Sequence, residues 1–304
     1  MAKGRQLKGR IRSVQNTRKI TRTMELVSTS KLKRAQDRVV AARPYAEALR
    51  EVLADLVTPD LAERFPLLRG PAAPGKGGPT RAAVILLTSN RGLAGAFNSN
   101  LIKEARRRVE ELERAGYTVD LYGIGKKGIG FFKYLHRKLA LERLDIGDKP
   151  TADHAAEVAQ PLIEAYSAGT LASVDLVHAK FISALTTPPT TTRILPVETG
   201  GQAAGRSGGH EAAAASSSRD YILAPSAEAI LEQLVPLYVR NMVYRGLVET
   251  AAAEHGARRT AMKNATDNAG EILEVLKRTY NRQRQAGITQ EIAEIVGGAA
   301  ALQG

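Results

Sequence analysis

The chain has 304 residues, of which 43% are apolar and 5% aromatic, with a formal net charge of +13. This composition can build a large hydrophobic core and excludes a chain that is disordered throughout. The chain has no cysteine, which excludes disulfides, thiolate metal sites and thiol-based switching.

The longest apolar run, residues 82–87, is much shorter than the ~20 residues of a membrane-spanning helix, so no span is expected. Residues 1–12 carry five basic side chains and no apolar stretch, so we expect no secretory signal and a cytoplasmic protein.

Residues 1–58 have the pattern of a long helix packed against another helix. Small or apolar residues recur every seven positions in two rows, from Leu7 to Leu56 and from Ile11 to Leu53. The rows become polar over residues 18–28, which predicts looser packing there and side chains available to a partner. Pro44 predicts a kink in this helix, and Thr58-Pro59 predicts its end.

The same segment carries most of the positive charge. Residues 1–43 contain thirteen lysines and arginines against Glu25 and Asp37, a net charge of +11 out of +13. A charge this concentrated indicates either an acidic protein partner or a polyanion, and otherwise a solvated surface.

Residues 59–80 are rich in proline and glycine and read as a linker. Residues 81–198 then alternate apolar runs with helical segments, which predicts a small Rossmann-like α/β domain with a largely parallel sheet. Strands are expected at 82–87, 118–124 and 174–184. Helices are expected from Asn98 or Ser99, as the N-cap, to about residue 114, and over 153–168, where Pro161 predicts a kink or a split.

Residues 199–225 contain a Gly, Ala and Ser tract that predicts a flexible loop and a short return segment. From residue 226 to 304 the helical pattern returns, with Ser226 as N-cap and Glu228 in the first turn. Rows seven apart start at Ile230 and Leu234. Because the first long helix enters the α/β domain and the second leaves it, we expect the two to form an antiparallel coiled coil.

No motif indicates catalysis. Residues 123–128 match G-x-G-x-x-G after a strand, but the helix that follows is short and interrupted at Gly130, so a dinucleotide site is disfavoured. The five histidines are not spaced as metal ligands, and helix packing explains His255 better. We therefore expect no cofactor and no metal. A basic coiled-coil nucleic-acid-binding protein is the alternative function, although aromatic residues for base stacking are few.

Three stretches closely resemble the γ subunit family of rotary (F-type) ATP synthases from bacteria: SVQNTRKITRTMELVSTSKLKRAQ at residues 13–36, EHGARRTAMKNATDNA at 254–269 and YNRQRQAGITQEIAEIVGGAAA at 280–301. Shorter similarities lie at residues 43–47 and 90–98, so the resemblance covers nearly the whole chain. It implies the same fold, an antiparallel coiled coil of the terminal helices with a central α/β domain.

The resemblance also implies a function, that of the central rotor shaft of a proton-translocating ATP synthase, without a catalytic site of its own. Its partners would be the α and β subunits of the catalytic hexamer, the ε subunit and the ring of c subunits, and not nucleic acid. It would lie peripherally on the cytoplasmic face of the bacterial plasma membrane and couple proton flow to ATP synthesis or hydrolysis.

Site residues follow from the same resemblance. Contacts with β subunit loops are implied for one set: Met24, Arg258, Arg284, Gln285, Thr289 and Glu291. A basic face toward an acidic β loop is implied for a second set: Arg18, Lys19, Arg22, Lys31 and Lys33. Individually weak exposed ion pairs would guide the shaft without locking it.

The sequence departs from the family pattern at two positions. Members commonly have Asp where Asn90 stands, and an acidic residue where Ala224 stands. The second difference concerns contact with the c ring, including that of Tyr221.

Overall fold

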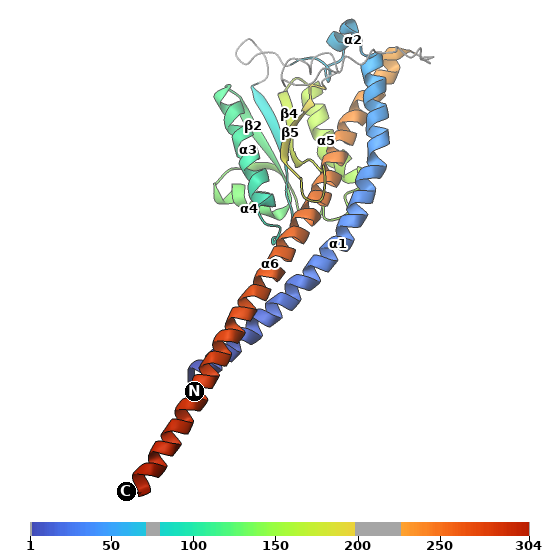
Figure 1. The fold of residues 1–304 in the computed structure, drawn as a ribbon. Coiled ribbons are helices and arrows are strands. Elements are labelled where there is room, and N and C mark those ends of the chain that lie inside the picture. Colours follow the sequence, from blue (N-terminus) through green and yellow to red (C-terminus); the bar gives the residue numbers. More distant parts are fainter. Residues whose placement is uncertain (1, 71–79, 198–225, 304) are drawn as a thin grey trace, which may run out of the picture. The chain divides into compact units, whose positions relative to one another are not determined.

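The structure is a computed structural model that describes residues 2–70, 80–197 and 226–303 (Figure 1). The predicted Gly/Ala/Ser loop, Tyr221 and Ala224 lie outside the described residues. The chain divides into two compact units. Unit 1 comprises residues 1–30 and 258–304, and unit 2 comprises residues 31–257. None of the described helices is long and apolar enough to cross a bilayer.

Two long helices begin and end the described chain, and both contribute to each unit. They are α1 (Ala2–Leu56) and α6 (Ala227–Gln303). In unit 1, Thr21 of α1 meets Thr266 of α6, and Arg18 lies beside Gly270. In unit 2, Leu53 and Leu56 of α1 share a core with the beginning of α6. The helices therefore run antiparallel in each unit, as predicted.

Unit 2 is built on a five-stranded sheet of order β3-β2-β1-β4-β5. Four strands are parallel, and β5 pairs antiparallel with β4. The strands are β1 (Arg81–Leu87), β2 (Thr118–Ile124), β3 (Leu139–Arg143), β4 (Leu171–Ala179) and β5 (Pro189–Leu195). This arrangement confirms the predicted Rossmann-like α/β domain.

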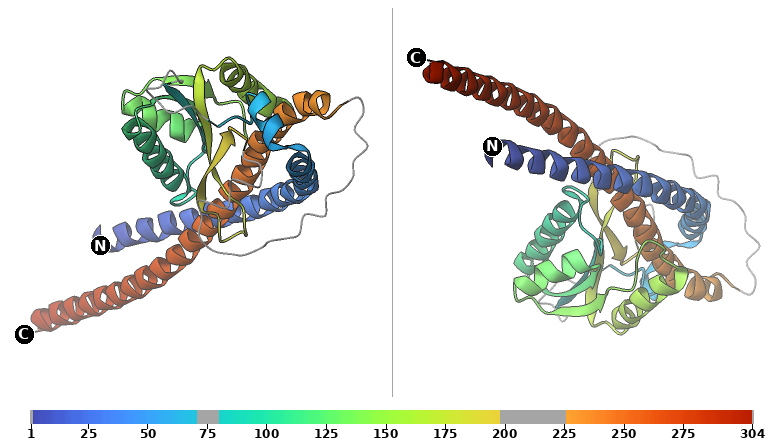
Figure 2. Two further views of the ribbon diagram at one scale, coloured as in Figure 1. Left: turned by 90° about the horizontal axis from the view of Figure 1, so that it is seen from above. Right: turned by 90° about the horizontal axis from the view of Figure 1, so that it is seen from below.

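Helices cover both faces of the sheet (Figure 2). The helices α3 (Phe97–Arg114) and α4 (Lys126–Tyr134) lie on one face, and α5 (Ala152–Ser167) lies on the other. Alternate residues of β1 face two hydrophobic cores. Ala83, Ile85 and Leu87 pack toward α5 and the start of α6, while residues 82, 84 and 86 pack toward α3. Burial on both faces explains why β1 reads as a continuous apolar run.

The heptad rows predicted for α1 are confirmed by burial. Ala35, Leu49 and Leu56 are buried in the first row, and Leu32 and Leu53 in the second. The polar positions Thr21, Glu25 and Ser28 are buried as well, so the seam of α1 continues through the segment that sequence reasoning expected to be looser.

The rows predicted for α6 are wrong by one residue in several places. Leu237 and Ile272 are exposed, whereas Leu231 and Leu273 are buried. A straight helix has 3.6 residues per turn, so a strict seven-residue row drifts ~20° around it with each repeat. Residues 246–253 are buried without interruption because the sheet packs against α6 there as well as α1.

The structure corrects several local predictions. The strands β3 and β5 were not predicted, and the predicted linker contains the helix α2 (Pro59–Arg64). The strand expected at 174–184 is β4, which lies at 171–179. Asn98 does not cap α3, because its side chain is bonded to Ser89.

The helices α1 and α5 continue past Pro44 and Pro161 without a break. Both prolines are exposed, so the carbonyl groups left without an N–H partner can bond to water. At α6 the predicted cap is confirmed, because the backbone N–H of Ala229 donates to the Ser226 hydroxyl at 3.2 Å.

Candidate functional site

The candidate site in unit 1 is the helix pair around residues 18–29 of α1. Its buried polar residues are internally bonded. The hydroxyl of Thr266 donates to that of Thr21 at 2.8 Å, and the Thr21 hydroxyl donates to the carbonyl of Arg18 at 3.1 Å. The hydroxyl of Ser28 donates to the carbonyl of Met24 at 2.7 Å. Burial of these groups therefore leaves no hydroxyl unsatisfied, and close packing of small side chains is possible.

The predicted basic residues fall into two groups. Arg22 pairs with Glu25 at 2.9 Å, and Lys33 pairs with Asp37 at 3.1 Å. Lys31 pairs with Asp148 of the loop after β3. Three of the five predicted basic residues are thus partly neutralised by carboxylates of this chain.

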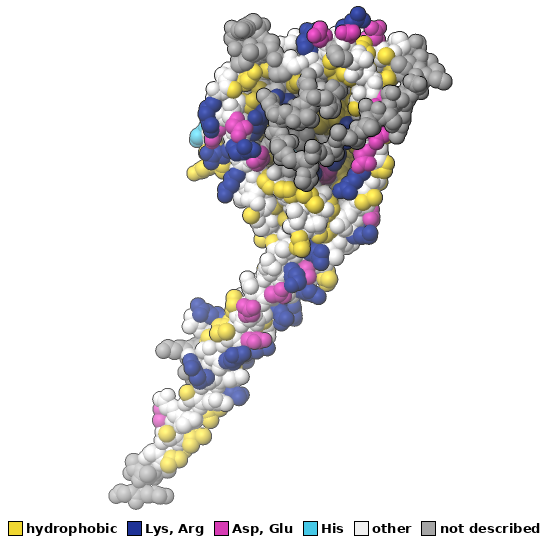
Figure 3. All heavy atoms as spheres, turned by 45° about the horizontal axis from the view of Figure 1, so that its top comes forward, with side chains coloured by type: hydrophobic (Ala, Val, Ile, Leu, Met, Phe, Trp, Pro, Cys, Tyr) yellow, Lys and Arg dark blue, Asp and Glu magenta, His cyan; other side chains and the backbone are white. Residues whose placement is uncertain are grey.

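Arg18 and Lys19 remain, and within the described parts of the chain neither forms an ion pair. Together with Arg22 they line a groove of about 780 Å³ in unit 1, whose other lining includes Thr266 and Asp267. Figure 3 shows Lys and Arg side chains along the helices. The groove is therefore the part of the predicted basic face that retains positive charge for a partner.

Asp148 is the partner of Lys31. Burial by itself would raise the pKa of Asp148, but the hydrogen bond from Lys31 and the charges of His255 and Arg91 hold the pKa below its usual value. The guanidinium of Arg38 donates to the Asp148 backbone carbonyl at 3.0 Å. Lys31 therefore helps to fix the loop after β3 to α1 within unit 2.

The residues implied to contact β subunit loops do not form one cluster. Arg284, Gln285, Thr289 and Glu291 are all exposed near the end of α6, and Met24 is half-buried on α1. Arg258 is 7% exposed, so its side chain is buried within this chain. Arg258 does not belong to an exposed contact surface in this structure.

The end of α6 extends past its partner helix. Thr21 of α1 lies opposite Thr266 of α6, and the two helices run antiparallel. Ala2, where α1 begins, therefore lies opposite about residue 285 of α6. Residues 288–298 of α6 are accordingly all exposed. They include four large apolar side chains at helical spacing: Ile288, Ile292, Ile295 and Val296. This tail has an apolar stripe with nothing in the described chain to cover it.

The G-x-G-x-x-G segment in unit 2 is closed to a phosphate by this chain's own groups. At the start of α4 the backbone N–H of Lys126 donates to the Asn90 side-chain oxygen at 2.9 Å. The N–H of Lys127 donates to the Ser89 carbonyl, and that of Gly128 to the Thr88 hydroxyl at 2.9 Å. The helix N-terminus therefore offers no free N–H groups of the kind a dinucleotide fingerprint supplies.

Asn90 also explains its departure from the family pattern. Its amide N–H₂ donates to the carbonyl of Leu144 at 2.8 Å, while its oxygen accepts from Lys126. An aspartate could accept but could not donate. Among the described residues, no cluster of His, Asp and Glu is arranged to hold a metal ion.

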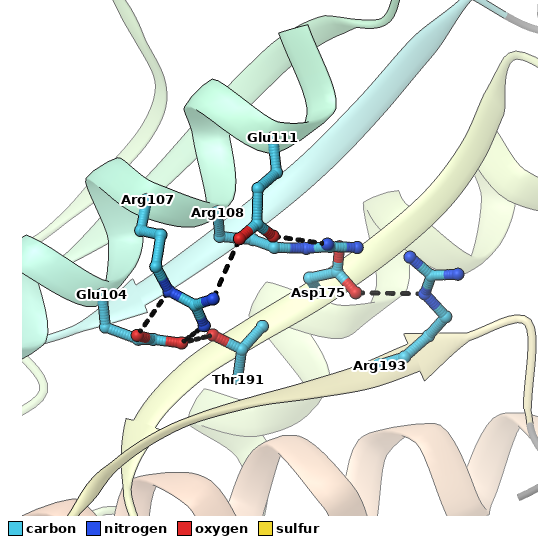
Figure 4. A network of polar contacts seen from close by, with 7 residues as sticks. All are labelled: Glu104, Arg107, Arg108, Glu111, Asp175, Thr191 and Arg193. Atoms are coloured by element: carbon cyan, nitrogen blue, oxygen red, sulfur yellow. Dashed lines mark hydrogen bonds and ion pairs between the residues drawn. The ribbon is translucent and has the colours of Figure 1, made fainter. Parts of the chain in front are cut away.

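A polar network fixes β5 to the sheet (Figure 4). The carboxylate of Asp175, on β4, is 1% exposed and accepts from Arg108 of α3 at 2.9 Å and from Arg193 of β5 at 3.1 Å. Glu104 accepts from Arg107 and from the Thr191 hydroxyl at 2.7 Å, and the bond from Arg107 lowers the pKa of Glu104. Sequence reasoning missed this network, although a lone carboxylate in an apolar strand is a signal for it.

Comparison with known proteins covers nearly the whole chain. A family model described as ATP synthase matches residues 3–302. A relative from Gemmatimonas aurantiaca, named ATP synthase gamma chain, is 60% identical over 304 residues and covers 100% of both chains. A relative of the same name from Moorella thermoacetica is 42% identical over 303 residues, again covering 100% of both.

Solved structures with the same fold come from mitochondrial ATP synthases. A chain of the Euglena gracilis OSCP/F1/c-ring structure aligns with a TM-score of 0.69 and 19% identity, over 99% of this chain and 95% of that one. A chain from the Tetrahymena thermophila central stalk/c-ring structure gives a TM-score of 0.54 with 21% identity, over 81% of this chain and 99% of that one. At this level of identity the likeness supports the fold.

Proposed function

The chain belongs to the ATP synthase gamma family, and we propose that it is a central rotor shaft that couples proton flow to ATP synthesis or hydrolysis. The observation that carries this proposal is the pair of long helices. At ~1.5 Å per residue, the 77 residues of α6 have a contour length of about 115 Å, far more than a five-stranded sheet needs. Such a helix serves to reach other subunits.

The proposed partners follow from the surfaces described above. The apolar tail of α6 and the exposed Arg284 and Gln285 would lie within a hexamer of α and β subunits, with Arg284 able to form a bidentate pair with a carboxylate. The α/β domain would contact the ε subunit and the c ring. The chain would then be peripheral to the membrane, on its cytoplasmic face, and would contribute no catalytic site of its own to the ATPase complex.

Copurification tests this function. The full chain, tagged and expressed with the other subunits of its own complex, is expected to copurify with α and β subunits in fixed stoichiometry and to be required for coupled activity. The nucleic-acid-binding alternative instead predicts DNA affinity of the isolated chain that falls steeply with salt. DNA binding without copurification would reject the rotor proposal.

The groove at Arg18 and Lys19 gives a specific prediction. The double variant R18E/K19E is expected to reduce ATP-driven proton pumping by reconstituted complex about two- to fivefold, because two exposed pairs contribute modestly to guiding a partner loop. The measurement is proton uptake into vesicles, with ATP hydrolysis assayed in parallel.

A matched variant, K103E/K138E, reverses two exposed charges of unit 2 that do not line the groove. It is expected to leave pumping unchanged. If both double variants pump equally well at equal assembly, the groove has no role in coupling.

A further inference from the structure

Unit 2 contains a cavity to which the proposed rotor function assigns no role. It has a volume of about 180 Å³ and lies between α1, the β4–β5 pair and α6. We call it the β4–β5 cavity. Close approach of α6 to the sheet shapes it, since a Cβ added to Gly246 would lie 2.6 Å from the side chain of Leu176.

Positive charge predominates in this cavity. Three basic side chains line it: Arg50 of α1, Lys180 directly after β4, and Arg245 of α6. Among the described residues that line it, the one carboxylate is Glu249, which is 3% exposed and accepts from Arg245 at 2.7 Å. Within the described residues, Arg50 and Lys180 have no ion-pair partner. Both side chains are exposed, so two cations at the cavity are available to an anion.

The opposite face of the same strand pair is compensated. There Arg193 and Thr191 of β5 point toward α3, and each bonds a carboxylate (Figure 4). Strand residues alternate between faces, so Thr190 and Thr192 of β5 line the cavity instead. The uncompensated charge thus belongs to the cavity and is not a general feature of this edge of the sheet.

A buried polar group in the cavity wall also lacks a partner. His178 is 8% exposed, and its Nδ1 atom has no hydrogen-bond partner among the described residues. Its Nε2 atom lies 3.9 Å from the carboxylate of Glu249. Burial lowers the pKa of His178, which keeps the ring neutral at pH 7 and able to donate one N–H. A buried nitrogen without a protein partner is uncommon, so His178 offers a polar atom to a ligand or water molecule in the cavity.

We propose that the β4–β5 cavity binds a small oxyanion of the size and charge of inorganic phosphate, held by Arg50 and Lys180 with donors from His178 and Thr192. Charge-assisted hydrogen bonds from lysine and arginine suit such a ligand. The cavity is smaller than the ~300–1,000 Å³ of typical ligand pockets, so a whole nucleotide does not fit. This inference does not depend on the rotor proposal.

The test is calorimetric titration of the purified full chain with sodium phosphate at constant ionic strength, with ADP titrated in parallel. Phosphate is expected to bind at one site, and ADP is expected not to. R50Q and K180Q are each expected to weaken phosphate binding about tenfold or more, the loss of one charge-assisted contact. The His178 ring resonance should shift on addition of phosphate in NMR spectra.

The control is K103Q, which removes an exposed lysine outside the cavity and should leave the affinity unchanged. Equal loss in K103Q and K180Q would mean general attraction of anions and would overturn the proposal. Absence of phosphate binding by the folded wild-type chain would overturn it too. Binding of ADP but not phosphate would show that the ligand class is wrong.

Discussion

Replacing Asp175 with Asn is expected to destabilise unit 2 by about 3 kcal/mol, because it removes one partner from a buried ion pair. The carboxylate of Asp175 is the only acceptor that links Arg108 of α3 to Arg193 of β5 in the described network (Figure 4). Without it Arg193 loses its carboxylate partner among the described residues, and Arg108 keeps only the pair with Glu111; each guanidinium is about one-fifth exposed. The measurement is urea unfolding of the full chain, followed by circular dichroism.

The control for this variant is Glu110→Gln on the exposed side of α3. Glu110 pairs with Arg106 at 3.2 Å and with Arg114 at 3.6 Å, and its side chain is 46% exposed. Exposed pairs contribute little, so a loss below about 1 kcal/mol is expected. Equal losses in the two variants would mean that the Asp175 network does not hold β5 in place.

Gly125→Ala is expected to cost more than about 3 kcal/mol of unfolding free energy, through backbone strain and a steric clash. Gly125 has φ +95°, and a Cβ there would lie 2.0 Å from the backbone oxygen of Thr88. Thr88 directly follows β1, and its backbone N–H donates to the Ile124 carbonyl at 2.8 Å, so the oxygen cannot move aside cheaply. The same urea experiment measures the effect.

Gly130, two residues after the G-x-G-x-x-G motif and inside α4, supplies the matched control. Nothing lies within 4 Å of a Cβ added there, and the residue is inside α4, so Gly130→Ala is expected to stabilise by about 0.5–1 kcal/mol. The pair of variants tests whether close packing against Thr88 requires a glycine at position 125. Similar, small effects at both positions would contradict its assignment to close packing.

The parts of the fold that follow from local pattern could be predicted. The strands β1 and β2 and the helix α3 are continuous apolar or amphipathic segments whose bounds agree with the sequence to within one or two residues. The rows of α1 were equally clear. Those of α6 were not, because helix geometry drifts from a strict seven-residue repeat and because the sheet buries a second side of the helix.

The edge strand β5 illustrates what local pattern does not contain. Its sequence, PTTTRIL, has the composition of a turn, yet it forms a strand that pairs with β4. Arg193 of this strand bonds to Asp175, a residue 18 positions earlier in the chain. Such a partner is recognisable only once the topology brings the strands together. The strand β3 is also short and half-exposed, so its apolar signal is weak.

The prediction of the candidate site from the sequence was limited in the same way, because it depends on tertiary contacts. Sequence grouped five basic residues as one face, but Lys31 finds Asp148, which is 117 positions away in the chain. Arg258 is buried by tertiary packing, which a local sequence motif does not predict. Of the five basic residues, Arg18 and Lys19 are the two that form no ion pair within the described chain.

The rotor proposal is tested most directly by observing rotation. In the assembled complex the α and β subunits are fixed to a surface, and a bead is attached to unit 2 of this chain through a cysteine introduced at exposed Lys103. The proposal predicts continuous rotation in one direction that requires ATP and stops when ATP is removed. ATP hydrolysis at the normal rate by assembled complexes whose beads stay still would contradict it.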